Sequence, residues 1–182
     1  MHTWFPADTH FGHENIIRYC SRPYDRVAQM DFDLARRWNE VVGDDDLVYH
    51  LGDFAMGKPD RWPAYRAELR GRIILVRGNH DRYLERVADA MRFEEVLVNA
   101  VVEIDGVRCW LNHYPLASHD ERDLKRPAAP GPYDLALCGH VHDNWRVRDG
   151  CVNAGVDVWG FAPGRLEQLL AARDGALWPS CA

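Results

Sequence analysis

The sequence predicts an α/β fold in which two mixed sheets pack face to face with helices outside them. Apolar runs that end in Gly and polar residues recur at 47–53, 73–81 and 135–143. Segments with helical spacing separate the early runs, as expected for strands of a parallel sheet joined by helices. The second half instead carries two hairpin patterns, so we expect a second sheet there.

The early helices and the last one are predicted by their apolar spacing. Apolar residues recur with helical period over 30–42 and over 83–91, and the N-terminal half therefore reads as alternating strands and helices. A closing helix is expected within 163–175, with Leu166, Leu169 and Leu170 on its inner face.

The turns of the second half are marked by Asp-Gly pairs. Asp105-Gly106 and Asp149-Gly150 each separate two strand-like runs, and Asp-Gly is a favoured two-residue hairpin turn. Residues 117–134 are polar and rich in Pro, which predicts a long surface loop that could overhang a site.

Length and composition indicate one domain over residues 1–182. No linker divides the 182 residues, and no run approaches 18 apolar residues, so we expect no membrane span. The first ten residues lack the features of a secretory signal, and the five cysteines have no C-x-x-C spacing. We therefore expect reduced cysteines and a cytoplasmic location.

Polar side chains follow each predicted strand. Ligands of open α/β sheets bind at the carboxyl ends of the strands, so these side chains are expected to converge. Two pairs are spaced i, i+2, which directs both side chains of a pair to one side of an extended chain. The collected residues are Asp8, His10, Asp53, Asn79, His80, His113, His140 and His142.

Imidazoles mixed with carboxylates and an amide indicate a site for divalent transition metals. The absence of Cys from the set argues against a structural zinc site. We expect Mn²⁺ first, with Fe²⁺, Zn²⁺ or Ni²⁺ as alternatives. The ligands are too many for one ion, and a pair of ions about 4 Å apart is the arrangement used in phosphoryl transfer.

Five motifs occur in a fixed order along the chain. They are D-x-H at 8–10, G-D at 52–53, G-N-H-D at 78–81, His113 and G-H-x-H at 139–142. In these motifs the sequence resembles the calcineurin-like binuclear metallophosphoesterases. The resemblance implies an αββα sandwich and covers most of the chain.

The resemblance also assigns roles to the polar residues. It implies that Asp53 bridges two ions and that His80 is the general acid which protonates the leaving oxygen. One ion would be held by Asp8, His10 and His142, and the other by Asn79, His113 and His140.

Some segments depart from the protein phosphatases of this superfamily. The text "GDFAMGK" and "GNHD" argues against a phosphoprotein phosphatase, which carries G-D-x-x-D-R-G and G-N-H-E. The segments "DTHFGHENIIRY", "YHLGDF", "NHYP" and "NAGVDVWGFAP" instead look like the small bacterial and phage branch.

Three further residues have two readings each. His13 could face the substrate phosphate or close the first loop. Asp81 could orient His80, or it could cap the helix that follows. His50 lies inside a strand, and a packed histidine with one satisfied nitrogen fits it better than catalysis.

The expected function is hydrolysis of small phosphodiesters or phosphomonoesters, of nucleotide type, by a metal-bridging hydroxide. The net charge of −6 does not favour nucleic acid as a partner. A metal-dependent nuclease is the alternative, and a non-catalytic docking module is a further one. The residues that could form a basic groove for a nuclease are Arg18, Arg22, Arg26, Lys125 and Arg126.

Overall fold

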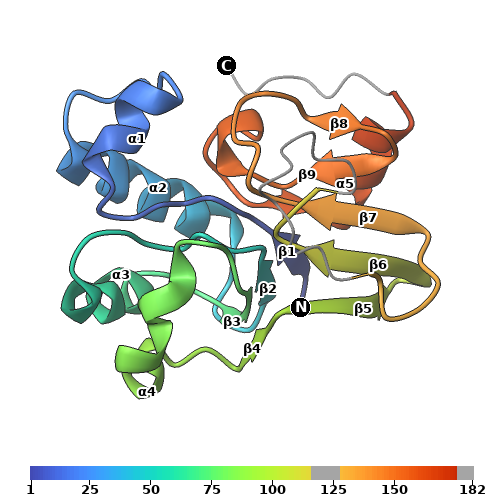
Figure 1. Cartoon of the computed structure of the whole chain (residues 1–182), viewed down its shortest axis with the longest axis horizontal. Coiled ribbons are helices and arrows are strands. Elements are labelled where there is room, and N and C mark those ends of the chain that lie inside the picture. The colour runs from blue at the N-terminus through green and yellow to red at the C-terminus, as the bar shows by residue number, and fades with distance from the viewer. Residues whose placement is uncertain (116–127, 176–182) are drawn as a thin grey trace.

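The computed structural model describes residues 1–115 and 128–175, which form two mixed sheets flanked by helices. In the described residues the first sheet has the strand order β10-β1-β2-β3-β4, and the second has the order β5-β6-β7-β9-β8. Figure 1 shows helices α1 to α4 on one side of the first sheet and the second sheet on its other side. The predicted fold class is confirmed.

The first sheet is parallel except at one edge. Its parallel strands are β1 (Thr3–Phe5), β2 (Leu47–His50), β3 (Arg72–Val76) and β4 (Glu95–Leu97), and β10 (Gly164–Arg165) pairs antiparallel with β1. The central strands are apolar almost throughout because both faces of the sheet are covered. β4 and β10 have only three and two residues, too few for an apolar period to reveal them.

Helices α1 (Glu14–Tyr19), α2 (Val27–Val41), α3 (Trp62–Ala67) and α4 (Ala88–Met91) cover the first sheet. α2 lies where the spacing predicts it and buries one apolar face against the strands. The largest side chains fully buried in this layer include Met30, Leu34, Trp38, Trp62, Ile73 and Met91.

The prediction of a single helix over 83–91 is wrong. A 3₁₀ helix spans Asp81–Arg86, and α4 follows as a separate turn. The carboxylate of Asp81 accepts hydrogen bonds from the backbone N–H groups of Gly78 and Asp53, both at 2.8 Å. The segment therefore starts as a tight turn tied to the preceding loops, and an α-helix does not form until residue 88.

The second sheet contains both predicted hairpins. β5 (Asn99–Ile104) pairs antiparallel with β6 (Val107–Asn112), and β8 (Val147–Arg148) pairs antiparallel with β9 (Cys151–Asn153). Both turn residues of each Asp-Gly pair have a φ between 50° and 79°, the conformation that a type I′ turn requires. β7 (Leu135–Cys138) runs parallel to β6 and β9, so the sheet is mixed.

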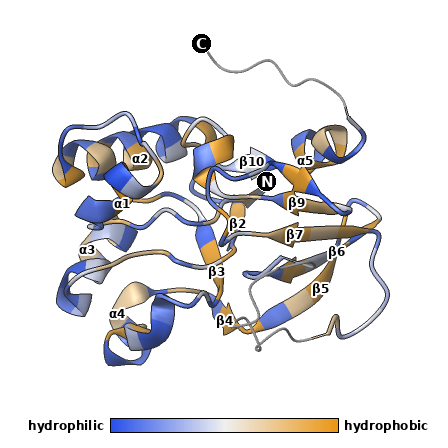
Figure 2. Cartoon of the chain, turned by 45° about the horizontal axis from the view of Figure 1, so that its top comes forward, coloured by the Kyte–Doolittle hydropathy of each residue, from blue (hydrophilic) through white to orange (hydrophobic). Residues whose placement is uncertain are grey.

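A second apolar layer fills the space between the two sheets. Helix α5 (Leu166–Arg173) packs against β9, β10 and β1, so it contacts both sheets. Leu166 and Leu169 are buried in this layer as predicted, whereas Leu170 is half-buried. In Figure 2 hydrophobic residues follow the strands of both sheets, and hydrophilic residues are frequent on the helices.

Three other expectations concern the loop, the membrane and the cysteines. Most of the loop expected over 117–134 lies outside the described residues, and its last part, 128–134, forms no helix or strand. In the described residues, none of the helices has the length and apolar character needed to cross a membrane. The cysteines at 20, 109, 138 and 151 form no disulfide, in line with the expected reduced state.

Candidate metal centre

Loops from both sheets meet at the carboxyl ends of their strands, as predicted. The backbone N–H of Asp8 donates to the carbonyl of Gly52, and that of His10 donates to the carbonyl of Asp53, both at 3.0 Å. The N–H of His140, from the second sheet, donates to Asp8 Oδ2 at 2.9 Å. The motifs that follow β1, β2 and β7 are therefore joined by backbone N–H donors, which donate to backbone carbonyls and to the Asp8 carboxylate.

Asp8, His10 and His142 form a cluster that we call the first half-site. Each offers one ligand atom, and these atoms lie within 4.8 Å of one another. Asp8 and His10 are fully buried, yet Asp8 Oδ1 and both ring nitrogens of His10 have no hydrogen-bond partner among the described residues. Buried polar atoms without a partner are unfavourable, and a bound cation would supply one.

Asn79, His113 and His140 form the second half-site. Asn79 Oδ1 lies 3.0 Å from His113 Nε2 and 3.0 Å from His140 Nδ1. His113 Nδ1 lies 2.8 Å from the carbonyl oxygen of Leu51, which can only accept, so we assign the ring proton to Nδ1. His113 Nε2 and Asn79 Oδ1 then face each other as two acceptors, an arrangement that suits a cation between them.

Asp53 lies between the two half-sites. Its Oδ2 is 3.5 Å from His10 Nε2 and 3.6 Å from His113 Nε2. Its Oδ1 accepts a hydrogen bond from the backbone N–H of His80 at 2.8 Å. A single carboxylate thus faces one histidine from each half-site.

Burial shifts the pKa values of the centre in a consistent way. It raises the pKa of Asp8 to about 8 and lowers the pKa of His113 to about 4. Burial also lowers the pKa of His10 well below its usual range. The imidazoles of His10 and His113 are therefore held neutral, the form that binds metals, and a divalent cation would bring the Asp8 carboxylate back to its charged form.

A cavity of about 420 Å³ opens over the centre, and His10, His13, His80 and His142 are among the residues that line it. His80 Nε2 lies 3.9 Å from Asp53 Oδ2, and the His80 side chain is 36% exposed, so it reaches both the centre and the cavity. His13 lines the same cavity, and its carbonyl accepts from the backbone N–H of Ile16 at the start of α1. The structure is consistent with both readings of His13.

Five of the predicted ligands have a left-handed backbone. The φ values are 56° at Asp8, 51° at His10, 58° at Asp53, 72° at His140 and 49° at His142. Residues other than Gly rarely adopt this backbone conformation, which costs on the order of 1–3 kcal/mol at each residue. Residues with such strain are common at functional sites, because this backbone conformation points side chains in directions that helices and strands do not allow.

Sequence reasoning missed a buried ion pair behind the first half-site. Arg22 is 4% exposed and donates from Nε and Nη2 to the two carboxylate oxygens of Asp157, at 2.7 and 3.0 Å. It also donates to the backbone carbonyls of Asp8 at 2.7 Å and Thr9 at 3.0 Å. The Arg22–Asp157 pair therefore fixes the backbone of the loop that carries Asp8 and His10.

Asp157 also contacts the third member of the first half-site. Its Oδ2 lies 3.2 Å from His142 Nδ1. Burial is the largest single effect and lowers the pKa of His142, but the hydrogen bonds with Asp157 and Cys20 and the charge of Asp8 together raise the pKa to about 11. Both oxygens of Asp157 are taken up by Arg22 and His142, so we do not assign a metal to the nearby cluster of Cys20, His142 and Asp157.

Asp81 has neither of the two roles considered from the sequence. Its fully buried carboxylate accepts from three backbone N–H groups, those of Asp53, Phe54 and Gly78. The side chain makes no cap bond to the helix that it starts. Asp81 instead joins the loop after β2 to the loop after β3.

The other sequence-based readings have separate outcomes. His50 is a packed histidine as expected, with Nε2 bonded to Thr9 Oγ1 at 2.9 Å and Nδ1 without a partner among the described residues. Arg22 is wrong as a candidate for a basic groove because it is buried in its ion pair, whereas Arg18 and Arg26 are exposed. Lys125 and Arg126 lie outside the described residues.

Comparison with known proteins identifies the family. Residues 1–177 match the model of the Calcineurin-like phosphoesterase superfamily domain. The chain belongs to this superfamily. The family is metal-dependent, which agrees with the Asp and His clusters at the strand ends.

Relatives come from archaea, phages and bacteria. The chain is 38% identical over 115 residues to "Uncharacterized protein MJ1445" of Methanocaldococcus jannaschii, and the match covers 62% of this chain and 58% of that protein, less than two thirds of its length. It is 28% identical to "Gene 66 protein" of Mycobacterium phage L5, over 87% of each chain. The solved structure of AQ665 from Aquifex aeolicus, a protein of unknown function, superposes with a TM-score of 0.73 at 27% identity, covering 94% of this chain and 98% of that one.

Proposed function

We propose that the chain is a phosphoesterase that hydrolyses small phosphodiesters or phosphomonoesters of nucleotide type at a binuclear metal centre. The observation that carries the proposal is the place of Asp53 Oδ2, 3.5 and 3.6 Å from one histidine of each half-site. One carboxylate oxygen between two clusters of ligands is what a pair of bridged ions requires. We expect Mn²⁺ first, with Fe²⁺, Zn²⁺ and Ni²⁺ as alternatives.

The side chains divide the chemistry between them. Asp8, His10 and His142 would hold one ion, and Asn79, His113 and His140 the other, with Asp53 between. Two bound ions would lower the pKa of a shared water from about 15.7 toward about 7 and would neutralise charge on the phosphate oxygens. The two carboxylates, Asp8 and Asp53, offset only part of the charge of two divalent ions, so the centre attracts an anion although the chain is acidic overall.

His80 is the proposed general acid. Its backbone is anchored by Asp53 Oδ1, and its ring lines the cavity where the leaving group would lie. Proton donation by a positioned side chain contributes roughly 10²- to 10⁴-fold to a rate. His80→Ala should therefore lose about this factor with an alkyl leaving group and much less with a nitrophenyl group, which needs no proton. Equal losses with both leaving groups would contradict this role.

Hydrolysis by metal-free protein, supplied in turn with Mn²⁺, Ni²⁺, Zn²⁺ and Mg²⁺, tests the proposal. The substrates are a nitrophenyl phosphodiester, its monoester, and single-stranded and duplex oligonucleotides. Turnover of the diester with a transition metal and not with Mg²⁺ is the expected result. Turnover of the oligonucleotides alone would favour the nuclease, and no turnover in protein shown to bind two ions would favour the docking module.

A further inference from the structure

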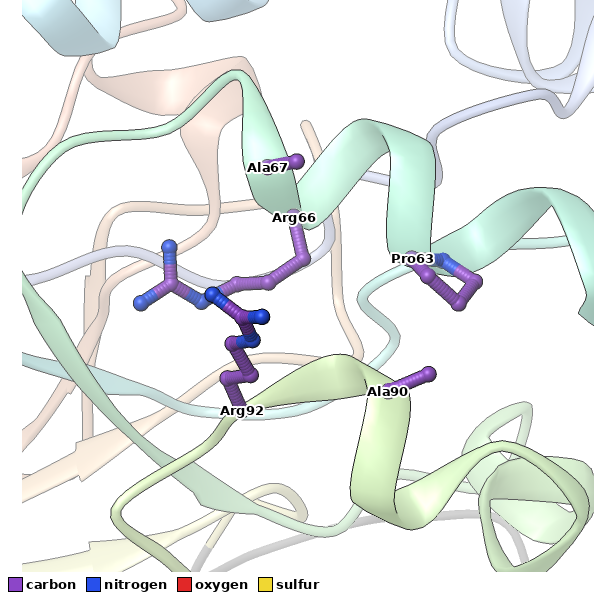
Figure 3. Close-up of a pocket in the computed structure, with 5 residues that line it drawn as sticks. All are labelled: Pro63, Arg66, Ala67, Ala90 and Arg92. Atoms are coloured by element: carbon purple, nitrogen blue, oxygen red, sulfur yellow. The ribbon is translucent and has the colours of Figure 1, made fainter.

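A second cavity lies away from the metal centre, between α3 and α4. Its volume is about 490 Å³, and Figure 3 shows the residues that line it, which are Pro63, Arg66, Ala67, Ala90 and Arg92. Arg66 donates to the carbonyls of Leu69 at 2.8 Å and Gly71 at 2.9 Å, just before the amino end of β3. The metal loops follow the carboxyl ends of the strands, so the two sites lie at opposite ends of the first sheet. We call this cavity the arginine pocket.

Two guanidinium groups line the arginine pocket without a carboxylate partner. Among the described residues, neither Arg66 nor Arg92 forms an ion pair within 4.0 Å, and Arg92 makes no hydrogen bond. Arg66 Nε is shielded from solvent and has no hydrogen-bond partner there. An anion in the cavity does not reach this shielded atom, but each Nη of Arg66 donates one N–H to a backbone carbonyl and keeps a second N–H for another acceptor.

The two charges also act on each other. Burial has the largest effect and lowers the pKa of the Arg66 guanidinium, Glu94 raises this pKa, and the charge of Arg92 lowers it by a smaller amount. Glu94 is therefore the nearby carboxylate to consider, yet it pairs with neither arginine within 4.0 Å among the described residues. The arginine pocket keeps an excess of positive charge in a chain whose net charge is −6.

We propose that the arginine pocket binds a phosphate group, either as the free ion or as part of a small organic phosphate. Guanidinium groups present planar pairs of N–H donors that match the oxygens of phosphate. An oxyanion seated between the two groups would accept from the remaining Nη N–H groups of Arg66 and from the Arg92 guanidinium, and it would lie between two like charges. Pro63, Ala67 and Ala90 supply apolar walls, and a volume of about 490 Å³ leaves room for more than one phosphate group.

Equilibrium dialysis with labelled phosphate, on the full chain with and without its metals, tests this site. Arg92→Asn is the variant, because Asn removes the charge and tolerates the φ of 49° at this position. In chelated protein the wild type should bind one phosphate, and Arg92→Asn should bind it at least about tenfold more weakly, the loss expected for one charge-assisted contact. Arg148→Asn, an equal change of charge at an exposed residue of β8, is the matched control and should bind as the wild type does.

Further arms separate the possible sources and the two sites. Ten-fold tighter binding of a nucleoside monophosphate than of phosphate would assign the site to organic phosphates, and the reverse would assign it to the free ion. Equal binding by chelated wild type and Arg92→Asn, or equal displacement of phosphate by chloride, would overturn the proposal. After loading with metal, the wild type and Arg92→Asn should each bind one additional phosphate, at the metal centre. If neither does, the proposed metal centre fails and the arginine pocket is unaffected.

Discussion

The two half-sites of the candidate metal centre are supported in different ways. Behind the first half-site lies an ion pair, since Arg22 binds Asp157 and the loop carbonyls, and Asp157 binds His142. The second half-site is supported by neutral groups, because His113 donates to a backbone carbonyl. Asp81 secures the loops around both through backbone N–H groups.

This difference has a consequence for how each half-site fails. Removal of one member of a buried ion pair leaves an uncompensated charge, which destabilises far more than the loss of a neutral hydrogen bond. The first half-site should therefore couple metal binding to folding strongly, and the second should couple it weakly. Variants that reach one half-site only can test this.

Asp53→Ala should have the largest effect because Asp53 faces both half-sites. We expect neither ion to bind at its normal affinity and hydrolysis to fall by about 10³-fold or more, since several kcal/mol of transition-state stabilisation depend on the ions. Metal content after dialysis, measured together with the rate, checks this. Retention of one ion at full affinity would show that Asp53 serves one half-site alone.

Asp157→Ala should affect the first half-site only. The unpaired Arg22 should lower the free energy of unfolding by about 3–5 kcal/mol, and metal affinity there should fall roughly 10- to 100-fold. Denaturant unfolding and metal titration measure the two quantities.

The double variant Arg22→Met, Asp157→Leu separates the two effects. It removes both charges, so it should regain stability without regaining metal affinity. If both return together, Asp157 acts on folding and does not position His142.

Asp81→Asn should have a smaller effect that reaches the second half-site. The Asn amide keeps one acceptor oxygen, but its NH₂ group would face backbone N–H groups that donate to the carboxylate in the wild type. We expect a loss of about 1–3 kcal/mol in stability and about tenfold in metal affinity at the second half-site. Unchanged metal affinity, by titration with the first half-site filled, would limit Asp81 to a structural role.

Asp46→Ala is the matched variant away from the centre, and it should leave metal affinity unchanged. Asp46 accepts from the backbone N–H of His2, from Gly43 N–H and from the Trp4 indole, and these bonds lower its pKa to about 2. A carboxyl group whose pKa is lower in the folded state stabilises the fold at pH values above its unfolded pKa, near 4. This stabilisation is lost as the pH falls toward the folded pKa of about 2. Acid unfolding curves should show this loss in the wild type and not in Asp46→Ala.

The sequence was sufficient to predict much of the fold and the convergence of the polar residues at the strand ends. Apolar runs that end in Gly placed β2, β3 and β7, and the convergence of strand ends brought both half-sites together. In a parallel sheet all carboxyl ends lie at the same edge, so residues that follow different strands meet there. A local pattern that marks the end of each strand is therefore enough to predict this convergence. The Asp-Gly turns located the hairpins of the second sheet for the same reason.

What the sequence could not show depends on distant partners. Arg22 and Asp157 are 135 positions apart, and nothing local to either indicates a pair. The same holds for Asp81, whose local spacing fits a helix cap but whose acceptors serve another loop. The short strands β4 and β10 form because neighbouring strands pair with them, which a window of two or three residues cannot reveal.

The left-handed backbone at five of the proposed ligands means that the side chains needed for metal binding lower the stability of the fold. A ligand changed to Gly or Asn would relax its φ, so at these positions loss of a metal ligand and relief of strain come from the same substitution. Such a substitution would stabilise the scaffold, so folding alone does not favour Asp or His at these positions. The Asp and His side chains at these positions therefore fit the proposed role as metal ligands better than a structural role.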